Sequence, residues 1–179
     1  MIDNLKRIIS QLRTRGAILP SSKFLVNRMV NRIDFSKDQN LLQLGFGTGV
    51  FTKAIIERMT PNSKLIIFEI NKKYNKYKIN DSRIVYVYDS AENICQYYHD
   101  VKFDNIISTL PLASLPKKIT VNIFIQIKIF LKKDGSFLQF QYSLISKKNI
   151  SKLFNTKPKV SFELFNCPPA FTYEVINKG

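Results

Sequence analysis

The sequence predicts one α/β domain built on a mainly parallel sheet. Apolar runs of strand length alternate with segments of helical period, and turn residues fall between them. The chain of 179 residues has the length of a single domain. Its last two predicted strands follow each other without a helix between them, so we expect an antiparallel edge that resembles a hairpin.

Seven strands and six helices make up this prediction. The strands are expected at Asn40–Leu44, Lys64–Phe68, Arg83–Tyr88, Asp104–Thr109, Gly135–Tyr142, Lys159–Leu164 and Phe171–Ile176. The helices are expected at Phe24–Ile33, Gly49–Met59, Asn71–Tyr77, Ala91–Tyr98, Pro116–Leu131 and Lys147–Phe154. Ser21 and Ser22 are suited to cap the first helix, and Asp134-Gly135 is expected to close the fifth.

Residues 1–15 are predicted to form a separate amphipathic helix ahead of a domain at residues 16–179. Five apolar residues fall on an arc of about 120° at helical spacing: Ile2, Leu5, Ile8, Ile9 and Leu12. Four basic residues lie on its flanks or far side: Lys6, Arg7, Arg13 and Arg15. Such a helix lies in the plane of a membrane or packs on the domain's own core, and the pattern leaves both open.

The charge indicates an anionic partner. The 28 Lys and Arg residues against 13 Asp and Glu leave a net charge of +15, which suits nucleic acid or an acidic membrane surface. A Lys-rich coding bias would give the same number. The start MIDNLKR is unlike a secretion signal, and no run reaches the roughly 20 apolar residues of a membrane span, so we expect a cytoplasmic location. Cys95 and Cys167 follow no metal-ligand spacing, which predicts free, partly buried thiols and no metal site.

A glycine-rich turn follows the first strand and opens a helix. Glycines at 45, 47 and 49 allow a sharp turn and a close approach to a ligand. Glu69, at the end of the second strand, can accept hydrogen bonds from two ribose hydroxyls. Asp89, after the third strand, suits an adenine amino group. The GxGxG spacing lacks the third glycine of a pyrophosphate site, so it favours an adenosyl ligand over a dinucleotide.

Six segments give the chain a resemblance to a known family. They are Gly16-Ala17-Ile18-Leu19-Pro20-Ser21-Ser22, Leu44-Gly45-Phe46-Gly47-Thr48-Gly49, Phe68-Glu69-Ile70-Asn71, Phe103-Asp104-Asn105-Ile106-Ile107-Ser108-Thr109-Leu110-Pro111-Leu112, Phe140-Gln141-Tyr142-Ser143 and Asn166-Cys167-Pro168-Pro169-Ala170. With them the sequence resembles the bacterial phospholipid N-methyltransferases, which are distantly similar to RNA adenine dimethylases. Two positions depart from that family: Gln43 replaces its usual Glu or Asp, and Phe46 replaces its usual proline.

This resemblance implies a three-layer, Rossmann-like class I methyltransferase fold. It also implies S-adenosylmethionine as cofactor, S-adenosylhomocysteine as product, and methyl transfer to the amine of phosphatidylethanolamine or its partially methylated forms, towards phosphatidylcholine. The protein is then expected to be a monomer that binds an anionic membrane surface, on the inner face of the cytoplasmic membrane. Nucleic acid is the less favoured partner.

The expected site residues follow from the loop, the strand ends and the resemblance. Cofactor contacts are expected from Gln43, Gly45, Phe46, Gly47, Thr48, Gly49, Glu69, Ile70, Asp89, Ser90, Ala91, Ser108 and Leu110. Ser108 and Tyr142 are expected to hold the nucleophile, with the Tyr142 ring facing a methylated ammonium. Ser21 and Lys23 are expected to meet a lipid phosphate. His99, the only histidine, is expected at the surface.

Three other functions compete with this interpretation. An aminolipid such as ornithine lipid presents a similar amine. An RNA adenine dimethylase would suit the basic charge, but Ser108-Thr109-Leu110-Pro111-Leu112 lacks the aromatic ring that stacks on a flipped base. The third is a membrane-attached regulatory module that binds the cofactor without catalysis, for which Gln43 is the only indication.

Overall fold

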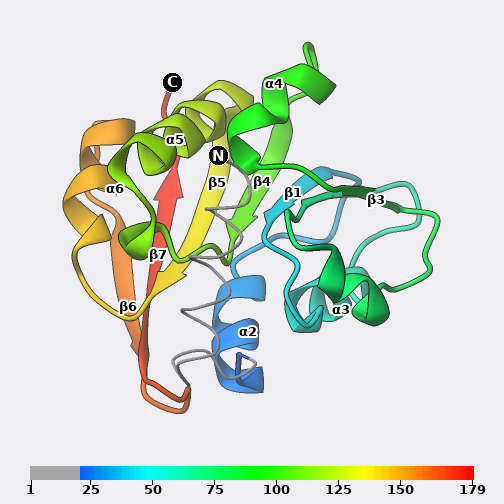
Figure 1. Cartoon of the computed structure of the whole chain (residues 1–179), viewed down its shortest axis with the longest axis horizontal. Helices are drawn as coiled ribbons and strands as arrows, with labels where there is room; N and C mark the ends of the chain where they lie inside the picture. The colour runs from blue at the N-terminus through cyan, green and yellow to red at the C-terminus, as the bar shows by residue number, and fades with distance from the viewer. Residues whose placement is uncertain (1–20) are drawn as a thin grey trace.

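The computed structural model describes residues 21–179 as a mixed sheet covered by helices on both faces (Figure 1). The predicted amphipathic helix at residues 1–15 lies outside the described residues. Seven strands form the sheet in the order β3-β2-β1-β4-β5-β7-β6. The predicted fold class is confirmed. None of the helices between residues 21 and 179 has the length and apolar content of a membrane-spanning helix.

All seven predicted strands are present, most of them within a residue or two of the expected bounds. They are β1 (Asn40–Leu44), β2 (Lys64–Phe68), β3 (Ile84–Val87), β4 (Phe103–Ser108), β5 (Leu131–Gln141), β6 (Lys159–Glu163) and β7 (Ala170–Ile176). The helices are α2 (Lys23–Val30), α3 (Val50–Ile56), α4 (Ile94–Tyr97), α5 (Lys117–Phe130) and α6 (Ser146–Phe154), with 3-10 turns η2 (Lys72–Tyr77), η3 (Ala91–Asn93) and η4 (Leu112–Ser114).

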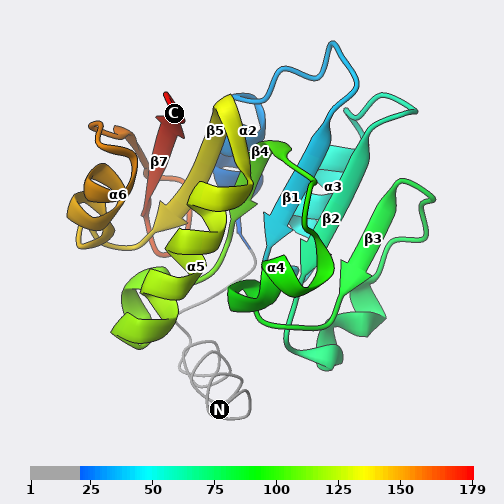
Figure 2. The same ribbon diagram turned by 90° about the horizontal axis from the view of Figure 1, so that it is seen from above.

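The helices divide into two layers, as the two views in Figures 1 and 2 show. Helices α2 and α3 lie on one face, where Leu25, Met29 and Ile55 join the core. Helices α4, α5 and α6 cover the other face, where Ile123 and Phe154 pack. β1 has helices on both faces, which explains why it reads as an apolar run rather than as an alternating strand.

The antiparallel edge is confirmed, with β7 as the reversed strand. β1, β2, β3, β4 and β5 pair in parallel. β7 runs antiparallel to both β5 and β6, so β6 forms the edge and points the same way as the central strands. The turn between β6 and β7 therefore lies at the end of the sheet where the parallel strands terminate.

Some local predictions need correction. α5 ends at Phe130, and Asp134-Gly135 lies inside β5, where the register with β4 shifts. Asp134 has a φ of 60°, and a Cβ on Gly135 would lie 2.7 Å from the Asp104 carbonyl oxygen. The pair is a bulge against β4, not the end of a helix. In segment Asn71–Tyr77 the 3-10 turn η2 replaces the predicted helix; it buries no residue fully, and only Tyr74 packs against the core, so little burial favours a full helix there.

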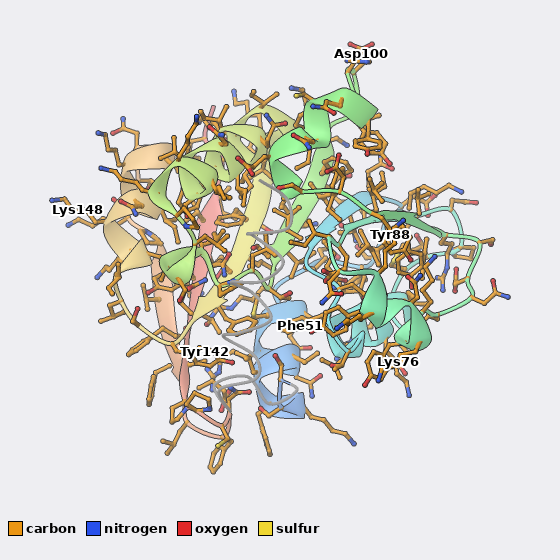
Figure 3. All side chains as sticks on the ribbon, in the orientation of Figure 1. Phe51, Lys76, Tyr88, Asp100, Tyr142 and Lys148 are labelled. Carbon is orange, nitrogen blue, oxygen red and sulfur yellow. The ribbon has the colours of Figure 1, made fainter. Side chains whose placement is uncertain are left out.

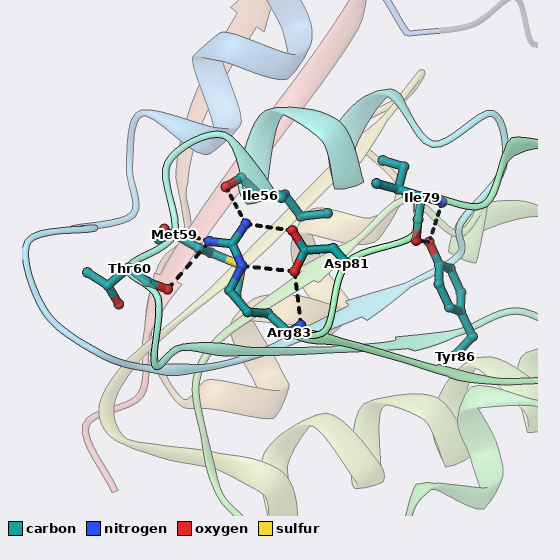
Figure 4. A network of polar contacts seen from close by, with 7 residues as sticks. All are labelled: Ile56, Met59, Thr60, Ile79, Asp81, Arg83 and Tyr86. Atoms are coloured by element: carbon teal, nitrogen blue, oxygen red, sulfur yellow. Dashed lines mark hydrogen bonds and ion pairs between the residues drawn. The ribbon is translucent and has the colours of Figure 1, made fainter.

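One arginine ties α3 to the start of β3 (Figure 4). The Arg83 guanidinium donates to the carbonyl oxygen of Ile56, the last residue of α3, at 3.2 Å and to that of Met59, just beyond it, at 2.7 Å. It also donates to both carboxylate oxygens of Asp81, at 2.9 and 2.7 Å. These bonds from Arg83 lower the pKa of Asp81 to about 2. The cluster satisfies carbonyl groups that the helix itself leaves without donors.

We predict that Arg83→Ala lowers the free energy of unfolding by about 2 kcal/mol, because charge-assisted hydrogen bonds to carbonyl groups are lost.

We also predict that Asp81→Asn removes a pH dependence of the free energy of unfolding. The lowered pKa means that the Asp81 contribution is complete above about pH 4 and disappears as the pH falls to about 2. Urea unfolding at several pH values measures both effects. An unchanged difference between wild type and Asp81→Asn from pH 5 to pH 2 would contradict the assignment.

Candidate active site

The glycine loop after β1 fits closely against the turn after β4. Gly45, Gly47 and Gly49 have φ values of 87°, 57° and 76°. The Gly45 amide donates to the Phe68 carbonyl at 2.8 Å, and the Thr109 hydroxyl donates to the Gly45 carbonyl at 3.0 Å. A Cβ on Gly45 would lie 2.7 Å from Thr109 Oγ1. Glycine at 45 is therefore required by conformation and by space.

Glu69 holds this loop with a buried carboxylate. Its Oε2 accepts from the amides of Phe46 at 3.0 Å and Gly47 at 3.2 Å, and its Oε1 accepts from the Asn71 amide at 2.9 Å. A carboxylate has about four acceptor positions, so these bonds leave about one for a ligand hydroxyl. The two ribose bonds expected from the sequence therefore require one loop amide to give way.

A first cavity opens beside Glu69, with about 300 Å³ of space between protein atoms that includes the opening to solvent. Its lining residues are Phe68, Glu69, Ile70, Asp89, Ser90, Ala91, Leu110, Leu115 and Ile123. Asp89 accepts from the Ser90 amide at 2.6 Å and the Tyr97 hydroxyl at 3.0 Å. The bond to Asp89 raises the pKa of Tyr97. An apolar slot with carboxylates at two strand ends suits a nucleoside.

Gln43 braces the glycine loop from inside the core. Its Nε2 donates to the Gly45 carbonyl at 2.8 Å, and its Oε1 accepts from the Thr52 hydroxyl at 2.8 Å. The side chain is fully buried. A carboxylate at this position would have no hydrogen to donate to the Gly45 carbonyl. The amide is therefore matched to this loop, and Thr52 on α3 fixes its orientation.

A second cavity of about 540 Å³ adjoins the first. Its lining residues are Thr109, Leu110, Pro111, Ala113, Ser114, Phe140, Gln141, Tyr142 and Ser143. Leu110 lines both cavities. The Leu110 carbonyl accepts from Gln139 Nε2 at 3.1 Å and Gln141 Nε2 at 3.0 Å, so two amides from β5 fix the residue that separates the cavities.

The structure brings many of the predicted residues together. Six of the expected cofactor residues line the first cavity: Glu69, Ile70, Asp89, Ser90, Ala91 and Leu110. The loop residues Gly45, Phe46, Gly47, Thr48 and Gly49 lie next to Glu69 in the fold. Tyr142 lines the second cavity, where its ring meets Phe140 edge-on at 5.8 Å.

Other predicted residues lie elsewhere. Ser108 is fully buried at the end of β4, lines neither cavity, and accepts a long 3.4 Å bond from the Leu110 amide, so it supports the loop from behind. Ser21 and Lys23 are not among the residues that line the second cavity. Ser22 caps α2 by accepting from the Leu25 amide at 3.2 Å. His99 is exposed, as expected.

The prediction of partly buried thiols is wrong, because Cys95 and Cys167 are both exposed. Cys95 lies on the outer side of α4, and Cys167 lies in the turn before β7. Both are free, and the described residues contain no cluster of His, Cys, Asp and Glu that would hold a metal ion.

Several residues around the site were not among the predicted site residues. Leu115 and Ile123 reach the first cavity through the packing of α5, which no local pattern shows. Gln139 and Gln141 did leave a signal. They are polar residues two positions apart in a buried apolar strand, so they share one face and need partners there.

Comparison with known proteins finds a curated relative and solved structures with a similar fold. No protein-family model matches the chain. A curated relative, the ornithine lipid N-methyltransferase of Singulisphaera acidiphila, is 26% identical over 165 residues, which cover 88% of this chain and 86% of the relative. The N-methyltransferase NodS of Bradyrhizobium japonicum, solved with S-adenosyl-L-homocysteine, is similar with a TM-score of 0.72 at 12% identity, over 96% of this chain and 99% of that one.

The chain has the class I methyltransferase fold. A ribosomal RNA methylase of Streptococcus thermophilus also shares it, with a TM-score of 0.61 at 12% identity, over 87% of this chain and 95% of that one. S-adenosylmethionine fits the site: the glycines adopt positive φ without strain and let the backbone come close to a ligand, Glu69 and Asp89 line the first cavity, and a Cβ on Gly49 would press on the Phe46 ring at 3.1 Å.

We predict that Glu69→Gln weakens S-adenosylmethionine binding at least about tenfold. The amide has one acceptor oxygen for three backbone donors, so either the glycine loop or Asn71 loses its partner. Glu57→Gln makes the same chemical change at an exposed position and should leave the affinity unchanged. Titration calorimetry measures both. Equal affinities for Glu69→Gln and wild type would show that this carboxylate does not organise the site.

Replacing Gln43 with glutamate should destabilise this protein. Gln43→Glu puts a carboxylate against the Gly45 carbonyl at a fully buried position, and we expect a loss of about 2 kcal/mol in the free energy of unfolding at pH 8. Thermal unfolding measures it, with Gln96→Glu on the exposed side of α4 as control. A more stable Gln43→Glu protein would show that the amide is not matched to the loop.

Proposed function

We propose that this protein transfers methyl groups from S-adenosylmethionine to the amine of an aminolipid. The observation that carries the proposal is the meeting of two cavities at Leu110, one suited to an adenosyl group and the other open to a second molecule. When bound, the cofactor supplies an electrophilic methyl group. A methyl donor and an acceptor held on either side of one fixed residue need little further ordering to react.

The second cavity suits an amine nucleophile. Among its lining residues, none carries a charged side chain. Desolvation in such a site lowers the pKa of an amine and favours the neutral form, whose lone pair attacks the methyl group. The rings of Phe140 and Tyr142 stand at 75° to each other and offer π faces to the methylated cation, with each contact contributing about 0.5–2 kcal/mol.

Ornithine lipid is the first candidate substrate, because the curated relative carries that activity in its name. Phosphatidylethanolamine is the second, because the six sequence segments resemble the phospholipid enzymes. Both headgroups present a primary amine near an anionic group. The fold does not favour a lipid over RNA, since an RNA methylase shares it. The absence of an aromatic residue directly after Pro111 argues against base stacking.

We also propose that the protein works as a peripheral monomer on the cytoplasmic membrane. The net charge of +15 favours an anionic surface, and the amphipathic pattern of residues 1–15 favours attachment in the plane of the membrane. Such attachment would present the second cavity to a substrate that does not leave the bilayer.

The decisive assay offers S-adenosylmethionine with a labelled methyl group and three acceptors in parallel. We expect label in ornithine lipid at the highest kcat/KM, weaker labelling of phosphatidylethanolamine and none in RNA. Glu69→Ala, which removes all three acceptor bonds of the carboxylate, serves as the inactive control. Label in RNA, or in neither lipid, would contradict the proposed function. Mass spectrometry of the labelled lipid gives the number of methyl groups.

A further inference from the structure

We propose that the turn between β6 and β7, together with the start of α2, inserts into a lipid bilayer beside the opening of the second cavity. The proposal rests on the lipid substrate proposed above and adds the surface that reaches it. Three large side chains form this surface, which we call the tip surface: Phe24, Leu164 and Phe165. None of them belongs to the predicted N-terminal helix.

The tip surface exposes apolar side chains without polar cover. Leu164 is 61% exposed and Phe165 is 68% exposed, on consecutive residues just beyond the end of β6. Phe24, at 60%, packs its ring against Phe165 at a tilt of 41°, with 5.2 Å between centroids. Clustered exposed aromatic and aliphatic residues of this kind mark an interaction surface, whereas single exposed apolar residues need no explanation.

Polar contacts hold the tip surface in place from behind. The Ser22 amide donates to Asn166 Oδ1 at 2.9 Å, which joins the start of α2 to the turn. Arg28 donates to the buried carboxylate of Glu163 at 2.6 Å, and the Phe165 amide donates to the same carboxylate at 3.0 Å. Burial alone would raise the pKa of Glu163, but these bonds lower it below its ordinary value. The apolar residues thus project from a braced base.

The tip surface lies at the same end of the sheet as the second cavity. β6 runs parallel to β5, so the turn after β6 and Tyr142 after β5 share one edge. Figure 3 shows Tyr142 at the end of the molecule where this turn and α2 project in Figure 1. Leu144 and Ile145, 49% and 70% exposed, follow Tyr142 on the same connection and extend the apolar edge.

Charge favours an anionic bilayer as the occupant. In residues 21–33 and 140–170 the basic residues are Lys23, Arg28, Arg32, Lys147, Lys148, Lys152, Lys157 and Lys159. Glu163 is the only acidic residue in the two ranges and pairs with Arg28, whereas Arg32 and Lys159 pair with Glu174 on β7. Lys23 directly precedes Phe24, and Lys147 and Lys148 follow Ile145, so cations adjoin the apolar residues at both places. Apolar residues with such neighbours suit insertion below anionic headgroups.

The test compares matched double variants of the full chain in vesicle sedimentation. Leu164→Ser with Phe165→Ser should reduce binding to vesicles of phosphatidylcholine and phosphatidylglycerol by about tenfold or more. Ile125→Ser with Ile129→Ser is the control, because these α5 residues are each 46% exposed on the opposite face of the sheet from α2. Phe24→Ser changes the same surface at α2 instead of at the turn, and it should also weaken binding to these vesicles.

Each outcome decides the proposal. Unchanged vesicle binding by the turn variant, or an equal loss in the α5 control, would overturn it. A wild-type dimer in analytical ultracentrifugation that the turn variant converts to a monomer would assign the surface to a second copy instead. Vesicle binding is measured without methyl transfer, so a failure of this proposal can be distinguished from a failure of the proposed function. Calorimetry should show unchanged S-adenosylmethionine affinity in the turn variant, which confirms an intact fold.

Discussion

The close approach of the glycine loop to the turn after β4 is the constraint on which both cavities depend. Gly45 lies between the Phe68 carbonyl and the Thr109 side chain, where a Cβ has no room. Leu110, the next residue after Thr109, is then held from β5 by the amides of Gln139 and Gln141. The turn after β4 is therefore fixed by its contacts with the glycine loop after β1 and with the side chains of β5. Because it separates the two cavities, its position sets the distance between methyl donor and acceptor.

Charge is distributed differently inside and outside this site. The chain carries +15, yet the residues that line the second cavity are neutral. A positive field over a desolvated cavity disfavours a protonated amine, so both effects lower the pKa of a bound amine and favour the nucleophilic form. The same field attracts an anionic surface from outside. In the function proposed above, one composition would serve both binding to a membrane and activation of the nucleophile.

Local sequence predicted the parts of the fold that depend on local pattern. β1 and β2 begin and end where their apolar runs do, and Glu69 follows β2 as expected. The errors share a cause. Asp134-Gly135 has the composition of a helix end, but the Asp104 carbonyl makes it a bulge. Leu115 and Ile123 enter the site through contacts between distant segments, which no window of sequence contains. Gln139 and Gln141 stand out locally as polar residues in a buried strand, but their shared partner, the Leu110 carbonyl, does not.

The first and the last of the six segments that carry the resemblance connect two parts of the fold. The first ends at Ser22 and the last begins at Asn166, and the Ser22 amide donates to the Asn166 side chain across 144 residues. Asn166 in turn donates to the Pro168 carbonyl at 2.7 Å, which fixes the turn before β7. Neither residue lines a cavity. They set where α2 stands against the turn, and therefore how the apolar edge is placed relative to Tyr142. In the proposed reaction with an aminolipid, these two residues would shape the approach to the site without contacting the substrate.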